Sequence, residues 1–192
     1  VAGLSMGGGK ALIMANPHTD KTEAMFRSFG RFVETLKGRY ITTEDVGCIS
    51  RDIEWVSKET KHVAGLPLSQ GGSGDPSVMT GLGVYQGMRA CARQTWGSDS
   101  LSGRTIALQG FGHVASYLAE YLLKDGAQLI VTDINKEALD RAQRLEGVTV
   151  VSPENIYDTP CDIFSPNALG GILNKDTIPL LKCEVICGGA NN

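Results

Sequence analysis

The stretch Thr105–Asp133 has the sequence TIALQGFGHVASYLAEYLLKDGAQLIVTD. It contains a strand pattern, a glycine-rich turn, a helix pattern and a second strand pattern that ends in a carboxylate. The short apolar run Thr105–Leu108 is bounded by turn residues, as expected of a buried parallel strand, and Gln128–Thr132 has the same character. We therefore predict two parallel strands joined through one helix.

The turn between the first strand and the helix has small residues at the spacing that phosphate binding requires. Gly110 permits a tight turn, Gly112 lets the backbone approach a pyrophosphate, and Ala115 lets the helix pack closely on the strand. The free N–H groups and the dipole of the helix N-terminus favour an anion there. The flanking strand and helix make this pattern more specific than glycines alone, and it predicts a dinucleotide site.

Asp133 lies about 20 residues beyond the glycines, where an acid can accept a hydrogen bond from a ribose 2′-hydroxyl. The first basic residue after it is Lys136, so a 2′-phosphate would be repelled with little compensation, which favours NAD over NADP. The remaining residues that we assign to the cofactor in this stretch are Phe111, His113, Val114 and Ile134.

The composition is that of a soluble globular protein, with 192 residues, 42% hydrophobic and 20% charged. A net charge of −3 argues against nucleic acid or an acidic membrane surface as a partner. We find no apolar run that could span a bilayer and no signal start. The five cysteines are scattered without a metal-type pair, so we predict no metal site and a cytoplasmic location.

The two ends are unusual for an intact protein. The chain starts with Val1 only a few residues before a glycine motif, and it stops at Gly188–Asn192 just after a predicted strand. An α/β protein normally closes with a docked helix or an exposed tail. We therefore expect a fragment.

Lys10 follows the glycines Gly7, Gly8 and Gly9 and precedes the strand-like run Ala11–Ala15. The glycines would let the backbone approach a small ligand while the strand holds the ammonium in place. Lys10 could then polarise a carbonyl or bind a carboxylate. A turn with a solvated lysine fits the spacing equally well.

Two acids, Glu44 and Asp45, follow a short strand predicted at Tyr40–Thr42. Ligand sites of open sheets lie at such strand ends, so one of these acids could be a general acid or base. The cap of a helix N-terminus is an equal alternative.

Helices are predicted on both sides of these acids. Asp20 and Glu23 resemble a capping box at the start of a helix that ends before Gly38, and Ser50 would cap a short helix. A long glycine-rich loop over residues 64–76 is a possible binding loop. It precedes a predicted helix over Ser77–Trp96.

The polar loop Gly97–Gly103 marks the predicted domain boundary, with a partial catalytic and substrate domain over 1–97 and an NAD-binding domain over 98–192. Beyond Asp133 helix and strand patterns alternate, which predicts an α/β fold with a Rossmann-type doubly wound parallel sheet and right-handed crossovers. The predicted elements are a helix over Lys136–Leu145 and strands over Thr149–Val151, Asp162–Phe164 and Val185–Cys187.

Two loops follow predicted strands at the same sheet edge as the glycine turn, Ser165–Ala168 and Gly188–Asn192. They are candidates to line the nicotinamide half of a dinucleotide, with ordinary connecting loops as the alternative.

These pieces together resemble the glutamate, leucine, phenylalanine and valine dehydrogenases over nearly the whole chain. The stretch from Leu4 to Pro17 looks like the family's glycine-rich active-site signature, departing at Leu12. The resemblance implies that Lys10 is the catalytic lysine and that Asp45 in TEDVG is the catalytic aspartate. It also implies that Gly110, Gly112 and Asp133 form the dinucleotide fingerprint.

The resemblance adds further contacts to cofactor and substrate. ALGG (168–171) and GANN (189–192) match loops around the nicotinamide and the substrate amino group, and a small substrate-facing residue is common at position 43. The cofactor contacts implied in this way are Thr80 in MTGLGV, Pro166, Asn167, Ala168, Asn191 and Asn192. The implied substrate-binding residues are Gly7, Gly8, Thr43 and Asn192.

The branch is indicated by Asp75 and Pro76, where glutamate-using members carry an arginine. The match is better with the leucine, phenylalanine and valine enzymes. Cys48 replaces a usual threonine and Asn167 a usual cysteine, and neither change removes a catalytic group. The resemblance thus implies NAD-dependent, reversible oxidative deamination of an apolar L-amino acid to its 2-oxo acid and ammonia by a homo-oligomer.

The resemblance also implies that some groups lie outside this sequence. The family's carboxylate-binding lysine belongs to a segment before Val1, and helices that complete the side-chain pocket follow Asn192. Two alternatives to a working enzyme are therefore a fragment that binds NAD without turnover and an oligomerisation module.

Overall fold

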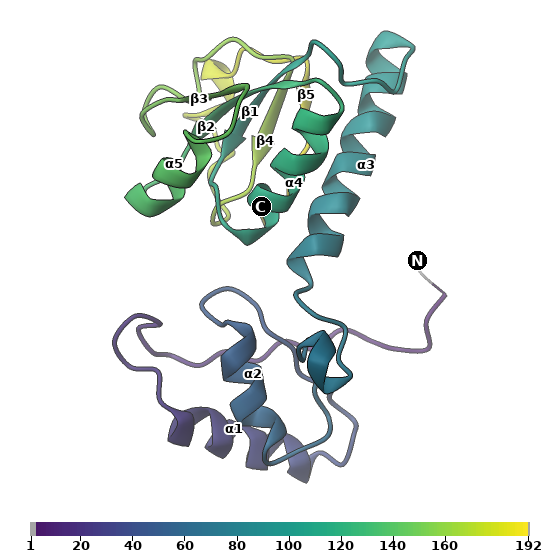
Figure 1. Cartoon of the computed structure of the whole chain (residues 1–192), viewed down its shortest axis with the longest axis vertical. Helices are drawn as coiled ribbons and strands as arrows, with labels where there is room; N and C mark the ends of the chain where they lie inside the picture. The colour runs from purple at the N-terminus through teal and green to yellow at the C-terminus, as the bar shows by residue number, and fades with distance from the viewer. Residues whose placement is uncertain (1–2, 192) are drawn as a thin grey trace. The chain divides into compact units, whose positions relative to one another are not determined.

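The computed structural model describes residues 3–191, which form two compact units. The first unit ends at Pro76 and the second begins at Ser77 (Figure 1). Within the described part of the chain, every helix is too short or too polar to cross a lipid bilayer.

The first unit is built on helix α1 (Glu23–Thr35). Thr22 caps this helix, because its hydroxyl accepts a hydrogen bond from the amide of Met25 at 3.2 Å. The prediction of Asp20 as the cap was therefore wrong. The Asp20 carboxylate instead accepts from the amide of Asn16 at 2.8 Å, closing the turn before the helix.

Helix α2 (Ser50–Ser57) packs against α1. Its first turn is held by Asp52, whose carboxylate accepts from the amide of Ile49 at 3.0 Å and from the ammonium of Lys21 at 2.5 Å. Ile49 is thus the cap position, one residue before the predicted Ser50. A 3-10 turn, η1 (Leu68–Gln70), interrupts the glycine-rich loop before Pro76. The buried apolar side chains of these two helices are Phe26, Val33, Ile53 and Val56.

The strands predicted in the first unit are reduced to one bridge. Thr42 pairs with Val63 in a single parallel bridge, in which its amide donates to His62 O at 3.0 Å. The run Ala11–Ala15 is extended, but it belongs to no strand of the structure, and the Leu12 and Met14 side chains are exposed. A strand exists only when a neighbouring backbone completes its hydrogen bonds, and residues 11–15 have no such neighbour within residues 3–191.

Helix α3 (Ser77–Trp96) has the predicted bounds and lies beside helix α4 (His113–Lys124) in the second unit (Figure 1). The close approach depends on Gly81, where a Cβ atom would lie 3.1 Å from both the Leu118 amide nitrogen and the Val114 carbonyl oxygen. The two compact units divide between Pro76 and Ser77, at the start of α3. The domain boundary predicted after α3, at the polar loop, stays a prediction.

A bulky residue at Gly81 is expected to push α3 off α4. Gly81→Val should lower the free energy of unfolding of the second unit by about 1–3 kcal/mol, the usual cost of overpacking, measured by urea denaturation. Gly83 on the same helix faces open space, so Gly83→Ala is a matched control that should stabilise the protein slightly. Equal effects of the two variants would contradict this packing.

The second unit contains a five-stranded parallel sheet with the order β3-β2-β1-β4-β5. This confirms the predicted α/β fold with a parallel sheet. Helix α5 is shorter than its predicted range, and the strands end within one or two residues of theirs. The bounds are β1 Thr105–Gln109, β2 Gln128–Thr132, α5 Lys136–Ala142, β3 Val148–Val150, β4 Ile163–Pro166, the 3-10 turn η2 Ile178–Leu180, and β5 Val185–Ile186.

Both faces of the sheet are covered. Alternate residues of β1 point to opposite sides, so Ile106 and Leu108 join α3, α4 and α5 in the larger core. Ala107 and Phe164 face the other side, where Ile156 covers them from the crossover between β3 and β4. The order of strands reverses direction between β1 and β4, and in open parallel sheets ligands bind at the carboxyl edge beside such a reversal.

Candidate functional site

The glycine turn lies at the carboxyl end of β1, where the strand order reverses. Gly110 has φ +94°, and a Cβ atom there would lie 2.8 Å from the amide nitrogen of Ala168. Only glycine fits this position, because a side chain would be strained and would also collide with the neighbouring loop. The turn is thereby packed against the loop that follows β4.

Gly112 occupies the cap position of α4 and has open space around it. No protein atom lies within 4 Å of a Cβ built at this residue, within the described residues. Space is therefore left open beside the α4 N-terminus, as an anion site requires. His113 and Val114 form the first turn of α4.

Asp133 is held directly beside the glycine turn, as the spacing predicted. One carboxylate oxygen accepts from the amide of Phe111 at 2.6 Å, and the other accepts from the amide of Asn135 at 2.7 Å. The Phe111 side chain is buried in the core, so this residue presents only backbone to the turn. The Ile134 side chain, in contrast, is 93% exposed.

The loops after β4 and β5 meet at the same edge. The amide of Ala190 donates to Pro166 O at 2.9 Å, and the amide of Gly189 donates to the side-chain oxygen of Asn167 at 3.1 Å. A Cβ at Gly188 would lie 2.2 Å from Pro166 O, so the two backbones are in direct contact. The structure thus brings both loops together with the glycine turn. The predicted contact at Asn192 lies outside the described residues.

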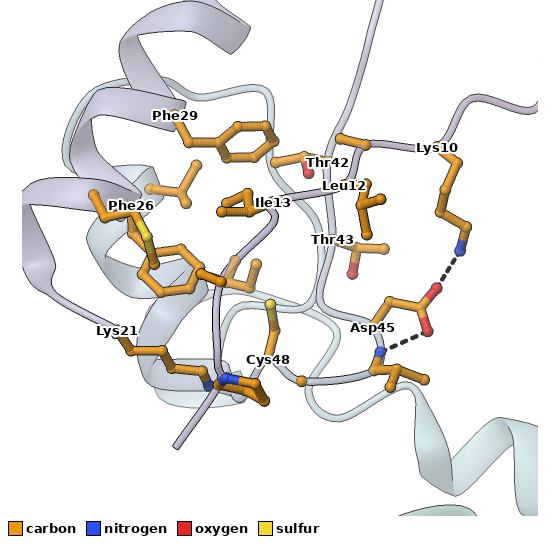
Figure 2. Close-up of a pocket in the computed structure, with 18 of the residues that line it drawn as sticks. Lys10, Leu12, Ile13, Lys21, Phe26, Phe29, Thr42, Thr43, Asp45 and Cys48 are labelled. Carbon is orange, nitrogen blue, oxygen red and sulfur yellow. Dashed lines mark hydrogen bonds and ion pairs between the residues drawn. The ribbon is translucent and has the colours of Figure 1, made fainter. Parts of the chain in front are cut away.

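Lys10 and Asp45 form an ion pair in the first unit, with the ammonium pointing at the carboxylate (Figure 2). The other carboxylate oxygen accepts from the amide of Val46 at 2.7 Å. Asp45 does not cap α2, whose cap position is Ile49, so the structural alternative considered for this acid is not what the chain forms. Both side chains remain accessible, with 76% of Lys10 and 56% of Asp45 exposed.

The ion pair moves both pKa values away from each other. The hydrogen bond with Asp45 and its negative charge raise the pKa of Lys10 above its ordinary value. The hydrogen bond from Lys10, followed by that from the Val46 amide, lowers the pKa of Asp45. The pair is therefore intact between the lowered pKa of Asp45 and the raised pKa of Lys10, and it is lost below the first and above the second.

This coupling gives a measurable shift at Lys10. In Asp45→Asn the pKa of Lys10 is expected to fall toward its ordinary value, because the attracting charge is gone. The measurement is an NMR titration of the lysine Cε signals, with the exposed Lys61 as the internal control. An unchanged Lys10 titration in the variant would mean that the pair does not persist in solution.

A hollow of about 360 Å³ opens beside this pair, within the first unit. Thr43 lies near the pair, while Ile13, Phe26 and Phe29 line the hollow farther from it (Figure 2). Most of the wall is apolar and comes from α1, α2 and the extended segments before them, including Ile13, Met25, Phe26, Phe29, Ile53 and Val56.

The other residues assigned to the site from sequence lie as follows. Gly7 and Gly8 are exposed in the extended segment before Lys10 and do not line the hollow, whereas Gly9 does. Thr80 is exposed in the first turn of α3. Asn191 is exposed, and its carbonyl oxygen lies against Gly170, where a Cβ would be 2.3 Å away.

One ion pair and one set of side-chain hydrogen bonds were not anticipated from the sequence, although Asn167 itself was assigned to the cofactor by the resemblance. Lys21 and the fully buried Asp52 form an ion pair at the edge of the hollow, and Asn167 makes several side-chain hydrogen bonds at the sheet edge. The charges of Lys21 and Asp52 lie 31 residues apart, and no spacing rule connects them.

Two family models match the chain in succession. The dimerisation domain of the Glu/Leu/Phe/Val dehydrogenases matches residues 1–62, and the following Glutamate/Leucine/Phenylalanine/Valine dehydrogenase model matches residues 71–136. The chain belongs to the Glu/Leu/Phe/Val dehydrogenase family. The second match contains the glycine turn and Asp133, and the first contains Lys10 and Asp45.

Relatives within this dehydrogenase family match along the whole chain. The leucine dehydrogenase of Thermoactinomyces intermedius is 53% identical over 191 residues, covering 100% of this chain and 52% of the relative. The phenylalanine dehydrogenase of Lysinibacillus sphaericus is 46% identical over 196 residues, covering 100% and 51%. The chain thus spans about half the length of the curated dehydrogenases that it matches.

The crystal structure of L-tryptophan dehydrogenase from Nostoc punctiforme has the same fold, with a TM-score of 0.68 and 44% identity. The match covers 97% of this chain and 51% of that protein. The chain therefore shares its fold over nearly its whole length with a solved L-tryptophan dehydrogenase.

Proposed function

We propose that this chain carries the NAD-binding turn and the lysine–aspartate pair of an L-amino-acid dehydrogenase that acts on an apolar amino acid. The observation that supports NAD binding is the Asp133 carboxylate beside an open glycine turn at the carboxyl edge of the sheet. Its oxygens can accept from a ribose hydroxyl, and a 2′-phosphate would meet a negative charge. The geometry therefore supports NAD rather than NADP.

The proposed reaction converts an L-amino acid, NAD⁺ and water into a 2-oxo acid, ammonium, NADH and a proton. NAD, when bound, supplies the hydride acceptor. Lys10 would hold the water that attacks the imine carbon and would stabilise negative charge on the oxygen of the resulting carbinolamine. Asp45 would take a proton from the substrate nitrogen or water and return it to the leaving ammonia.

The pKa directions fit this division of roles. The raised pKa of Lys10 favours its charged ammonium, the form that electrostatic stabilisation of an oxygen requires. The lowered pKa of Asp45 favours its ionised carboxylate, which is the form that can accept a proton, while the contact with Lys10 lowers its proton affinity. We assign positive charge to Lys10 and proton transfer to Asp45, instead of an acid–base role for the lysine.

An apolar substrate side chain is supported by two observations. The relatives include leucine and phenylalanine dehydrogenases, and the hollow beside Thr43 has a mostly apolar wall. The second candidate function is NAD binding without turnover, which is favoured by the coverage of about half of each relative. We also propose that the first unit contributes to a homo-oligomer, in keeping with the dimerisation-domain match.

The test measures binding and turnover separately. NADH and NADPH are titrated into the purified chain by fluorescence, and NADH formation from NAD⁺ is then followed with L-leucine, L-phenylalanine, L-valine and L-glutamate. Tighter binding of NADH than of NADPH together with turnover of an apolar amino acid supports the enzyme. Binding without turnover supports the second candidate, and no dinucleotide binding contradicts both. Light scattering of the same sample tests the homo-oligomer.

A further inference from the structure

Asn167 follows β4 and bonds to three different parts of the sheet edge. Its backbone amide donates to Gln109 O at the end of β1 at 2.7 Å. Its side-chain nitrogen donates to Ser165 O at 3.0 Å and to Ser165 Oγ at 2.9 Å. Its side-chain oxygen accepts from the amide of Gly189, after β5, at 3.1 Å.

The hydrogen-bonding capacity of this side chain is therefore committed within the protein. The side-chain nitrogen donates to two acceptors of Ser165, and the side-chain oxygen accepts from Gly189. Ser165 is fully buried, so its hydroxyl depends on such a partner. Both the donor end and the acceptor end of the side chain therefore already have partners within the protein.

We propose that Asn167 is a positioning residue, which fixes the Gly188–Ala190 loop against the loop after β4 so that both can border the nicotinamide ring. This inference rests on the proposed NAD binding. The contacts form a continuous series: Gly110 packs on Ala168, Asn167 holds Gly189, and the amide of Ala190 donates to Pro166 O.

The position of these loop contacts decides which half of a bound dinucleotide the Asn167 side chain would affect. We assign Asp133 and the α4 N-terminus to the adenosine ribose and the pyrophosphate. Among residues 3–191, neither shares a hydrogen bond with the Asn167 side chain. Loss of this side chain should therefore weaken contacts to the nicotinamide half and leave the ADP-ribose half unchanged. Two ligands, NADH and ADP-ribose, separate these effects.

The variant Asn167→Ala removes the tie, and Asn174→Ala is the matched control. Asn174 is another asparagine whose side chain bonds to backbone in a loop of the second unit, with a bond to Gly171 O at 3.1 Å. Asn167→Ala leaves the buried Ser165 hydroxyl without its partner, which lowers stability. The double variant Ser165→Ala, Asn167→Ala removes that hydroxyl, so it separates the effect on binding from the loss of stability. Thermal unfolding of each variant is measured first.

We expect the full chain to bind NADH more tightly than ADP-ribose. In Asn167→Ala and in the double variant, NADH affinity should fall about tenfold while ADP-ribose affinity stays within about twofold. The shift of NADH fluorescence on binding should shrink as well, because the ring environment changes. Asn174→Ala should alter none of these values.

The other outcomes are decisive too. Equal losses for both ligands, or no loss for either, would overturn the positioning role. A wild-type chain that binds NADH no tighter than ADP-ribose would also overturn it while leaving dinucleotide binding intact. A wild-type chain that binds neither ligand would instead contradict the proposed function itself.

Discussion

Replacing Gly112 with alanine is expected to lower NADH affinity by about a hundredfold, or about 2.7 kcal/mol. A methyl group at this position meets no protein atom within 4 Å among the described residues, so the fold should tolerate it. The same methyl group would occupy the space through which the backbone approaches the pyrophosphate. Affinity is measured by NADH fluorescence titration, and stability by thermal unfolding.

Gly110→Ala provides the contrast for this experiment. Its backbone has φ +94° and its added Cβ would collide with the Ala168 backbone, so this variant should be clearly destabilised. Gly112→Ala loses at most a small capping contribution of about 1 kcal/mol. If Gly112→Ala kept full NADH affinity, the pyrophosphate would not lie on this turn, and the assignment of the site would be wrong.

Lys10→Ala is expected to lower amino-acid-dependent NADH formation by about a thousandfold, since it removes the charge that would stabilise the reacting oxygen. NADH affinity should stay within about twofold, because the glycine turn and Asp133 belong to the other compact unit. The rate is measured in both directions, with L-leucine and with its 2-oxo acid plus ammonia.

Lys61→Ala, which alters another exposed lysine of the first unit, is the control and should leave the rate unchanged. A large loss of NADH affinity in Lys10→Ala would show that this lysine serves the cofactor. A rate that survives in Lys10→Ala would show that the lysine–aspartate pair is not part of the chemistry.

The second unit was predictable because its signals are local. The bounds of α3 and β2 agree with the sequence prediction residue for residue, since alternation, helical spacing and flanking glycines fix them within a short window. The proximity of Asp133 to the glycine turn was predictable for the same reason. A strand, a turn, a helix and a parallel strand have little freedom in how they pack.

The first unit was less predictable because strands depend on partners far along the chain. The apolar run Ala11–Ala15 has strand character, but sequence alone does not say whether a neighbouring backbone is present to pair with it. The cap of α1 was missed for a different reason. Asp20 and Thr22 are both good capping residues, and only the path of the turn before the helix selects between them.

The candidate site was also predictable only in part. Lys10 and Asp45 were both singled out from sequence, and the structure brings them together although 35 residues separate them. The ties made by Asn167 could not be foreseen, because an asparagine after a strand carries no signal for its partners. Those partners are set by the register of β4 and β5, which is a tertiary property.

The parallel pairing of β1 with β4 has a consequence for folding kinetics. Ile106 pairs with Ile163, so the chain must close a loop of more than fifty residues before this part of the sheet forms, whereas β1 and β2 are joined by a short crossover. We therefore expect β1, α4 and β2, which carry the glycine turn and Asp133, to assemble early. The loops after β4 and β5 should form late. A dinucleotide that contacts the glycine turn and these loops would then slow unfolding, because it would hold β4 paired with β1.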